Sequence, residues 1–173
     1  MSLDALRQKL CSTRVLVAFT VLFVASQATI GAILRDVGPM RVLRAQTTFS
    51  KTTFLAIVDQ WQREGVMPQY MRHFIPDFVH PVWYALFFAA LLARGLDRQH
   101  LPERWNAVLL LPFLAGAFDL VENCLHLVFL SDLGAVTQPL VALSALASNL
   151  KWALLAVSLV LVLGLRPWRP RRA

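Results

Sequence analysis

Long apolar runs separated by short polar segments dominate this chain. Each run reaches the length of about 20 residues that a helix needs to cross the hydrocarbon core of a bilayer. The runs cover about residues 15–34, 74–93, 105–130 and 139–165. The second run has Pro76 and Pro81 near its start, so we expect Pro76 in a first helical turn and a kink or restart at Pro81. The pattern predicts an all-α membrane protein in which four transmembrane helices form a bundle, as a single domain over residues 1–173.

Composition agrees with a membrane protein. Of the 173 residues, 57% are hydrophobic and 16% are charged, whereas an average soluble domain has about 25% charged residues. The net charge of +7 is scattered over termini and loops, so we expect no nucleic-acid partner, which would require a continuous basic face. Cys11 precedes the first run and Cys124 lies within the third, so we expect both cysteines to stay unpaired.

Lys and Arg in the short segments predict the orientation, because they gather on the cytoplasmic side. The segment over residues 131–138 carries Asp132 and no basic residue, while both ends of the chain and the segment after the second run are basic. We therefore expect a multi-pass protein of the bacterial inner membrane with both termini cytoplasmic. A cleaved signal peptide is the alternative for the first run, since Ser26-Gln27-Ala28 resembles a cleavage site. The basic residues that set the orientation are Arg7, Lys9, Arg14, Arg94, Arg98, Arg104, Arg166, Arg169, Arg171 and Arg172. The last four belong to a C-terminal tail that we expect to rest on anionic lipid head groups.

The outward segment over residues 36–73 is too long for a simple connection. Apolar residues recur at helical spacing within it over about residues 50–63, which predicts an amphipathic helix. These residues are Phe54, Leu55, Ile57, Val58 and Trp61. The helix either lies in the interface or packs on the bundle, or it forms a lid over a polar site.

Polar residues interrupt the third run at Asp119, Glu122, Asn123 and His126. Their spacings of three, four and seven return to one helical face. A charged side chain at bilayer depth costs about 2.5–3.5 kcal/mol on insertion scales and usually faces a protein interior. The four residues therefore indicate an internal site.

Lys151 in the fourth run is the expected partner of Asp119. At ~1.5 Å of rise per residue, Asp119 and Lys151 lie roughly 16 Å and 18 Å below the outer ends of their helices. The pair could be a structural link alone. Asp119 and Glu122, however, are two carboxylates for one lysine, so one proton should be retained between them. Because such a proton serves acid/base chemistry, Asp119, Glu122 and Lys151 are the candidate catalytic residues.

Other polar residues could complete the site. Tyr84 could reach the layer of Glu122, Asn123 could supply orienting hydrogen bonds, and His126 lies nearer the outer surface, where it could pass protons outward. A metal site would draw on Asp119, Glu122 and His126 with Asp77 or His80, but the duplicated motif of di-iron bundles is missing. Ser144, Ser148 and Lys151 also share a face as a possible Ser–Lys nucleophile, although small hydroxylated residues usually pack helices. We predict no metal and no cofactor.

The chain resembles an uncharacterised group of small bacterial membrane proteins with four spans. The resemblance covers residues 45–155 and implies that Asp77, Asp119, Glu122, Asn123 and Lys151 belong to one site, without implying an activity. We add Tyr84, His126 and Asn149 to Asp77 and Asn123 as candidate ligand-binding residues. The matching motifs are Pro76-Asp77, Pro81-x-x-Tyr84-Ala85, Phe118-Asp119-Leu120-Val121-Glu122-Asn123 and Asn149-Leu150-Lys151-Trp152.

The polar residues concentrate in the outward half of the bilayer, because residues 105–117 contribute only Asn106. This distribution favours a pocket that binds or acts on an amphiphilic ligand, a lipid or isoprenoid, over a conduction path. The alternatives are a structural subunit that pairs with a membrane protein partner and a proton-coupled transporter. Membrane lipids are expected partners in each case.

The predicted orientation can be tested with fused reporters. A reporter after Ala173 should read cytoplasmic and one inserted near Gly134 should read external, because only the latter segment lacks Lys and Arg. An external reading after Ala173 would contradict the four-span assignment.

Overall fold

The computed structural model describes residues 2–165, and over that range the chain is all-helical, with no strand. This confirms the predicted helical class. The expected basic tail, which includes Arg166, Arg169, Arg171 and Arg172, lies outside the described residues. Cys11 and Cys124 are both unpaired, as predicted.

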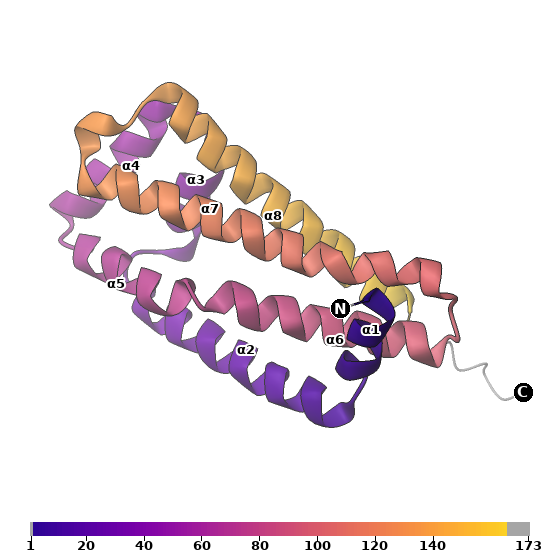
Figure 1. Cartoon of the computed structure of the whole chain (residues 1–173). Coiled ribbons are helices and arrows are strands. Elements are labelled where there is room, and N and C mark those ends of the chain that lie inside the picture. Colours follow the sequence, from indigo (N-terminus) through magenta and orange to yellow (C-terminus); the bar gives the residue numbers. More distant parts are fainter. Residues whose placement is uncertain (1, 166–173) are drawn as a thin grey trace, which may run out of the picture.

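Long helices lying side by side make up most of the molecule (Figure 1). Three helical stretches are long and apolar enough to cross a membrane: α2 (Thr13–Ile33), the stretch Glu103–Ser131, which joins η1 (Glu103–Leu110) to α7 (Leu111–Ser131), and α8 (Gln138–Gly164). The pair α5 (Met67–Asp77) and α6 (His80–Arg98) would be a fourth if the two helices, bent by 48°, form one span. The described residues therefore belong to a membrane protein with three or four candidate spans.

The break between α5 and α6 lies near the predicted irregularity. Pro81 falls in the first turn of α6, so the predicted restart is confirmed. The expectation for Pro76 is wrong, because it lies in the last turn of α5. There it cannot donate a hydrogen bond to the carbonyl oxygen of Arg72 and its ring crowds that carbonyl, which weakens the end of the helix. Backbone bonds from Phe78 N to Phe74 O and from Val79 N to Pro76 O close the turn.

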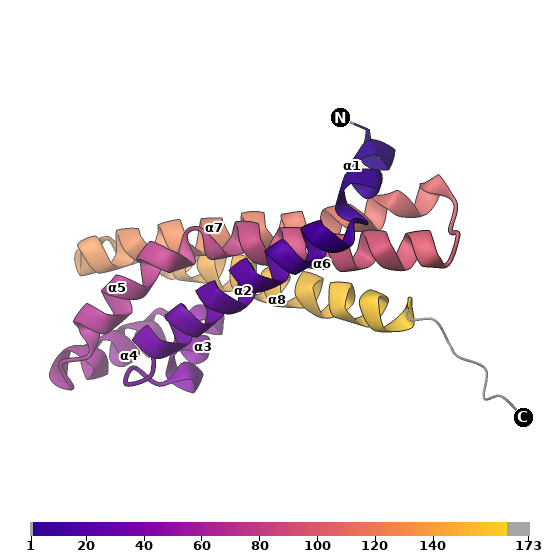
Figure 2. The same cartoon turned by 90° about the horizontal axis from the view of Figure 1, so that it is seen from below.

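Short helices cover the two ends of the long ones (Figures 1 and 2). At one end lie α3 (Pro39–Thr47), α4 (Lys51–Arg63) and η2 (Leu133–Ala135), and at the other lies α1 (Leu3–Leu10). The bounds of α4 agree with the predicted helix, whereas α3 and α1 were not predicted. The apolar face of α4 is buried through Phe54, Ile57, Val58 and Trp61.

Polar contacts hold these end helices in place. Ser50 accepts a hydrogen bond from Thr53 N at the start of α4. Arg41 of α3 forms an ion pair with Glu64 at the end of α4, and this guanidinium holds the pKa of Glu64 below its usual value. At the opposite end, Arg7 of α1 is buried and donates to Leu101 O at 2.9 Å and to Asn106 Oδ1 at 3.2 Å.

Gly116 lets α7 approach the beginning of α6. A Cβ atom at this position would lie 3.3 Å from the carbonyl oxygen of Pro81 and 3.5 Å from its Cβ atom. Gly31 on α2 is exposed, and a Cβ atom at this position would have no neighbour within 4 Å. The two glycines therefore form a matched pair for testing the packing beside the α5–α6 break.

We expect Gly116→Leu to destabilise the protein by about 1–3 kcal/mol, the usual cost of overpacking a tight contact. Gly31→Leu should leave stability unchanged or raise it, because glycine is unfavourable inside a helix. Thermal unfolding of both variants in the same detergent measures the difference. Equal melting temperatures for the two would contradict the close approach of α7 and α6.

Candidate functional site

Lys151 lies between two carboxylates in the middle of the protein. Its Nζ is 2.9 Å from Asp119 Oδ1 and 2.7 Å from Glu122 Oε2. Lys151 and Asp119 are each 4% exposed and Glu122 is fully buried. The predicted pairing of Asp119 with Lys151 is confirmed, and Glu122 joins it because it lies one helical turn further along α7.

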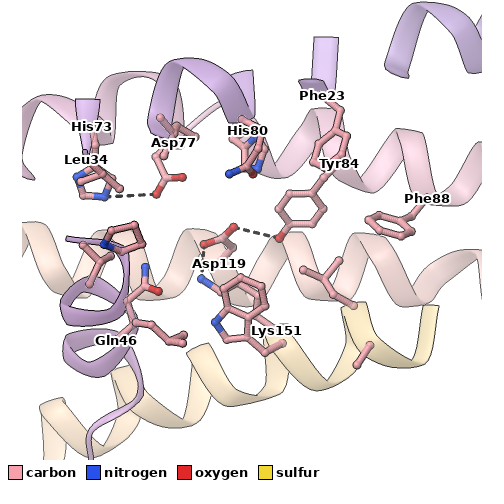
Figure 3. A pocket seen from close by; sticks show the side chains of 18 of the residues that line it. Phe23, Leu34, Gln46, His73, Asp77, His80, Tyr84, Phe88, Asp119 and Lys151 are labelled. Atoms are coloured by element: carbon pink, nitrogen blue, oxygen red, sulfur yellow. Dashed lines mark hydrogen bonds and ion pairs between the residues drawn. The ribbon is translucent and has the colours of Figure 1, made fainter. Parts of the chain in front are cut away.

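The two carboxylates have different surroundings. Asp119 accepts on both oxygens, from Lys151 at one and from the Tyr84 hydroxyl, at 3.1 Å, at the other (Figure 3). Within the described chain, neither oxygen of Glu122 accepts an aligned hydrogen bond, although Oε2 contacts the ammonium group. Full hydrogen bonding is the environment that an ionised carboxylate needs. Glu122 is therefore the better candidate for the carboxyl that retains a proton.

Three polar residues of the α5–α6 break face this cluster. Figure 3 shows Asp77, His80 and Tyr84 pointing toward Asp119 and Lys151. His73 Nδ1 contacts the backbone carbonyl of Tyr70, which can only accept, so this nitrogen carries a hydrogen. The other ring nitrogen, Nε2, lies 3.7 Å from Asp77 Oδ2.

His80 is oriented by a serine of α2. Its Nδ1 lies 2.8 Å from Ser26 Oγ, and the Ser26 hydroxyl donates to the carbonyl oxygen of Phe23 at 3.0 Å. Because a hydroxyl has one hydrogen to donate, both contacts form together only in the tautomer in which Nδ1 of His80 donates to Ser26. In the neutral ring, Nε2 of His80 is then an acceptor. The Phe23 ring stacks on the imidazole with centroids 5.6 Å apart.

A cavity of about 620 Å³ lies between the polar side chains of the α5–α6 break and the cluster of Asp119 and Lys151, and both line it. It lies between α2, which packs on α5 and α6, and α8, which packs on α7 and α3. Its polar lining consists of Gln27, Gln46, His73, Asp77, His80, Tyr84, Asp119 and Lys151, and its apolar lining includes Phe23, Ile30, Leu34, Val42, Leu43, Phe88, Leu155, Ala156 and Leu159. Exposed Met40, Trp152 and Leu159 also border it. The cavity therefore combines a charged floor with apolar walls and reaches the surface.

Four of the predicted site residues line the cavity, namely Asp77, Tyr84, Asp119 and Lys151. Glu122 lies behind them, in contact with Lys151. The Asn123 amide donates to the backbone oxygen of Asp77 at 3.4 Å, so it orients the break instead of lining the cavity.

His126 and Asn149 lie elsewhere. His126 is buried, with Nδ1 2.8 Å from the Tyr70 hydroxyl and its ring against Phe54 of α4. His126 lies near the end of α7, as its place in the third run predicted, but α4 covers its ring. Its role in passing protons outward stays a prediction. Asn149 is exposed on α8 and donates to Ala145 O of its own helix at 2.7 Å. Since two residues separate directions by about 200° on a helix, Lys151 and Asn149 point away from each other.

Sequence reasoning missed His73 and Gln46 as lining residues. The spacing of His73 and Asp77, four residues apart just before a helix break, was a usable signal. Gln46 gave none, because α3 was not predicted.

Metal and Ser–Lys chemistry find little support in the geometry. No group of three or more His, Cys, Asp or Glu side chains in residues 2–165 is arranged to hold a metal ion. Ser144 and Ser148 are buried and, among the described residues, their hydroxyls have no hydrogen-bond partner. Lys151 is bound by two carboxylates, so it is not placed to deprotonate either serine.

Comparison with protein-family models, curated proteins and solved structures found no match for this chain. The function is therefore argued from the cavity and its side chains alone.

Lys151→Met should destabilise the protein by about 3–5 kcal/mol, because it leaves two buried carboxylates without a cation. Combination with Asp119→Asn should recover much of that loss, since one of the two charges is then removed. Chemical denaturation of the wild type, both single variants and the double variant in one detergent measures the coupling. If the double variant is no more stable than the summed stability losses of the two single variants predict, the residues do not act as a pair.

Proposed function

We propose that this chain is an integral protein of the bacterial inner membrane that binds an amphiphilic ligand, a lipid or an isoprenoid, in the cavity between α2 and α8. The observation that carries the proposal is the cavity itself, about 620 Å³ in volume, with charged residues on its floor and apolar side chains on its walls. Ligand sites commonly measure about 300–1,000 Å³ and combine apolar walls with a few placed polar groups. An amphiphile satisfies both parts of this lining.

The proposed topology has four spans in a bundle, with α5 and α6 counted as one bent crossing. The N-terminus and the basic segment after α6 then lie in the cytoplasm, and α4 is an amphipathic helix on the outward side. Support comes from the distribution of Lys and Arg along the sequence and from the position of α1 and the end of α6 together at one end of the molecule (Figure 1).

Proton transfer is the chemistry that suits these side chains. Asp119 and Lys151 line the cavity, while Glu122 contacts Lys151 from behind. A ligand head group beside Asp119 could exchange a proton with this cluster, which holds two carboxylates for one ammonium group. Asp119, Glu122 and Lys151 are accordingly the residues proposed to act on the ligand.

The interior between Tyr84 and the end of the molecule that carries α1 favours ligand binding over the passage of ions or protons across the membrane. Apolar residues dominate the buried positions there, with Ala89, Leu92, Ala93, Leu96 and Leu109 in one cluster. Ser158, buried on α8, donates to Leu154 O of its own helix, and Arg7 pairs with Asn106 beside α1, so these polar residues do not form a continuous path. A polar path would have to continue through this region for ions or protons to cross.

The cavity can be filled without touching the charged cluster. Ala156 of α8 lines the cavity, whereas exposed Ala153, one turn earlier, does not. We expect Ala156→Phe to reduce the lipid that stays bound to the purified protein by about tenfold, equivalent to about 1.4 kcal/mol of binding. Ala153→Phe should leave the bound lipid unchanged.

Mass spectrometry of lipid extracted per mole of purified protein measures this effect, with the melting temperature as a check that both variants fold. Equal lipid content in the wild type and Ala156→Phe would overturn the proposed site. Equal loss in both variants would assign the bound lipid to the outer surface of α8 instead.

A further inference from the structure

The cavity floor carries more negative than positive groups. Asp77 and Asp119 line it and Glu122 lies just behind, whereas Lys151 is the only Lys or Arg among the described lining residues. Two of the three carboxylates already contact its ammonium group. A phosphate or carboxylate head group would therefore meet excess negative charge with no unshared cation, a costly arrangement in a poorly solvated site.

Asp77 is the carboxylate that remains for a ligand. It is 9% exposed and lines the cavity. Its only ion-pair partner in the described chain is His73, whose Nε2 lies 3.7 Å from Oδ2, beyond hydrogen-bonding distance. Since Nδ1 of His73 contacts the Tyr70 carbonyl, the ring lies beside Asp77 without donating to it, and the carboxylate faces the cavity that a ligand would enter.

The rest of the lining offers acceptors and aromatic rings. In the tautomer that satisfies both contacts of Ser26, Nε2 of neutral His80 is an acceptor. Four aromatic side chains also line the cavity, namely Phe23, Tyr84, Phe88 and Trp152. Ring faces attract cations within about 6 Å of the centroid, and Trp152 already has the Lys151 ammonium at 5.3 Å.

From this arrangement we infer that the ligand carries a cationic amine head group on an apolar chain. The inference rests on the proposed function and names its ligand class. The ammonium group binds beside Asp77 and His80, and the chain lies along the apolar walls of α2 and α8. An N–H-bearing cation supplies the donors and the positive charge that the lining lacks.

Three probes with one chain and different head groups test the inference: farnesylamine, farnesol and farnesyl phosphate. Binding is measured at neutral pH to the full-length protein in nanodiscs of zwitterionic lipid, and empty nanodiscs give the background from partition into lipid. We expect farnesylamine to bind about tenfold more tightly than farnesol, a difference of about 1.4 kcal/mol, and farnesyl phosphate to bind most weakly.

Asp77→Asn should bring the affinity for the amine close to that for the alcohol. Asp59→Asn is the control, because Asp59 is an exposed carboxylate of α4 that pairs with Arg63 and does not line the cavity. Its amine preference should equal that of the wild type. If Asp77→Asn does not fold, the ranking of the three probes on the wild type still decides the matter.

Tighter binding of farnesol or farnesyl phosphate than of farnesylamine would overturn the amine assignment while leaving the lipid site intact. An amine preference that Asp77→Asn does not change would also overturn the amine assignment, because the charge of Asp77 would then not contribute to recognition of the ligand. The proposed function fails separately, when Ala156→Phe changes neither the bound lipid nor the binding of any probe.

Discussion

The ammonium group of Lys151, held by Asp119 and Glu122, fixes the arrangement of the helices around it. Each buried ion costs several kcal/mol in lost hydration, and the cost is met only while the partners stay in contact. The ion pairs therefore hold α7 and α8 in register, and the hydrogen bond from Tyr84 to Asp119 adds α6. Helix α2 has no member in this cluster and packs instead on α5 and α6. Because α8 is held to α7 by the ion pairs and α2 packs on other helices, a space remains between α2 and α8.

The break between α5 and α6 provides the opposite side of the site. The break is bent by 48°, with Pro76 before it and Pro81 after it. Asp77 and His80 point from it toward Asp119 and Lys151, and His73 points toward Asp77 (Figure 3). The close approach at Gly116 brings α7 up to this break. A helix without the bend would direct α5 away from the other polar residues, so a local backbone irregularity determines which charges share the cavity.

The sequence predicted the charged pair well because a charge inside an apolar run is expensive in any fold. The depth of Asp119 and Lys151 follows from helical rise alone. Other features depend on which helices touch. His126 shares a face with Asp119, yet its accessibility depends on α4, which packs over it. Asn149 is close to Lys151 in sequence but points elsewhere. The cavity has no sequence signal, because empty space arises where two helices do not meet.

Exposed Met40, Trp152 and Leu159 border the cavity. In the proposed topology and function, this surface would touch acyl chains. A molecule dissolved in the membrane can then diffuse in the plane to the cavity without first entering water. Its hydrophobic gain has already been realised on partition into the lipid, at about 0.8 kcal/mol for each buried methylene. Occupancy would therefore follow the mole fraction of the ligand within the bilayer. Selectivity among molecules with the same chain would fall to their head groups.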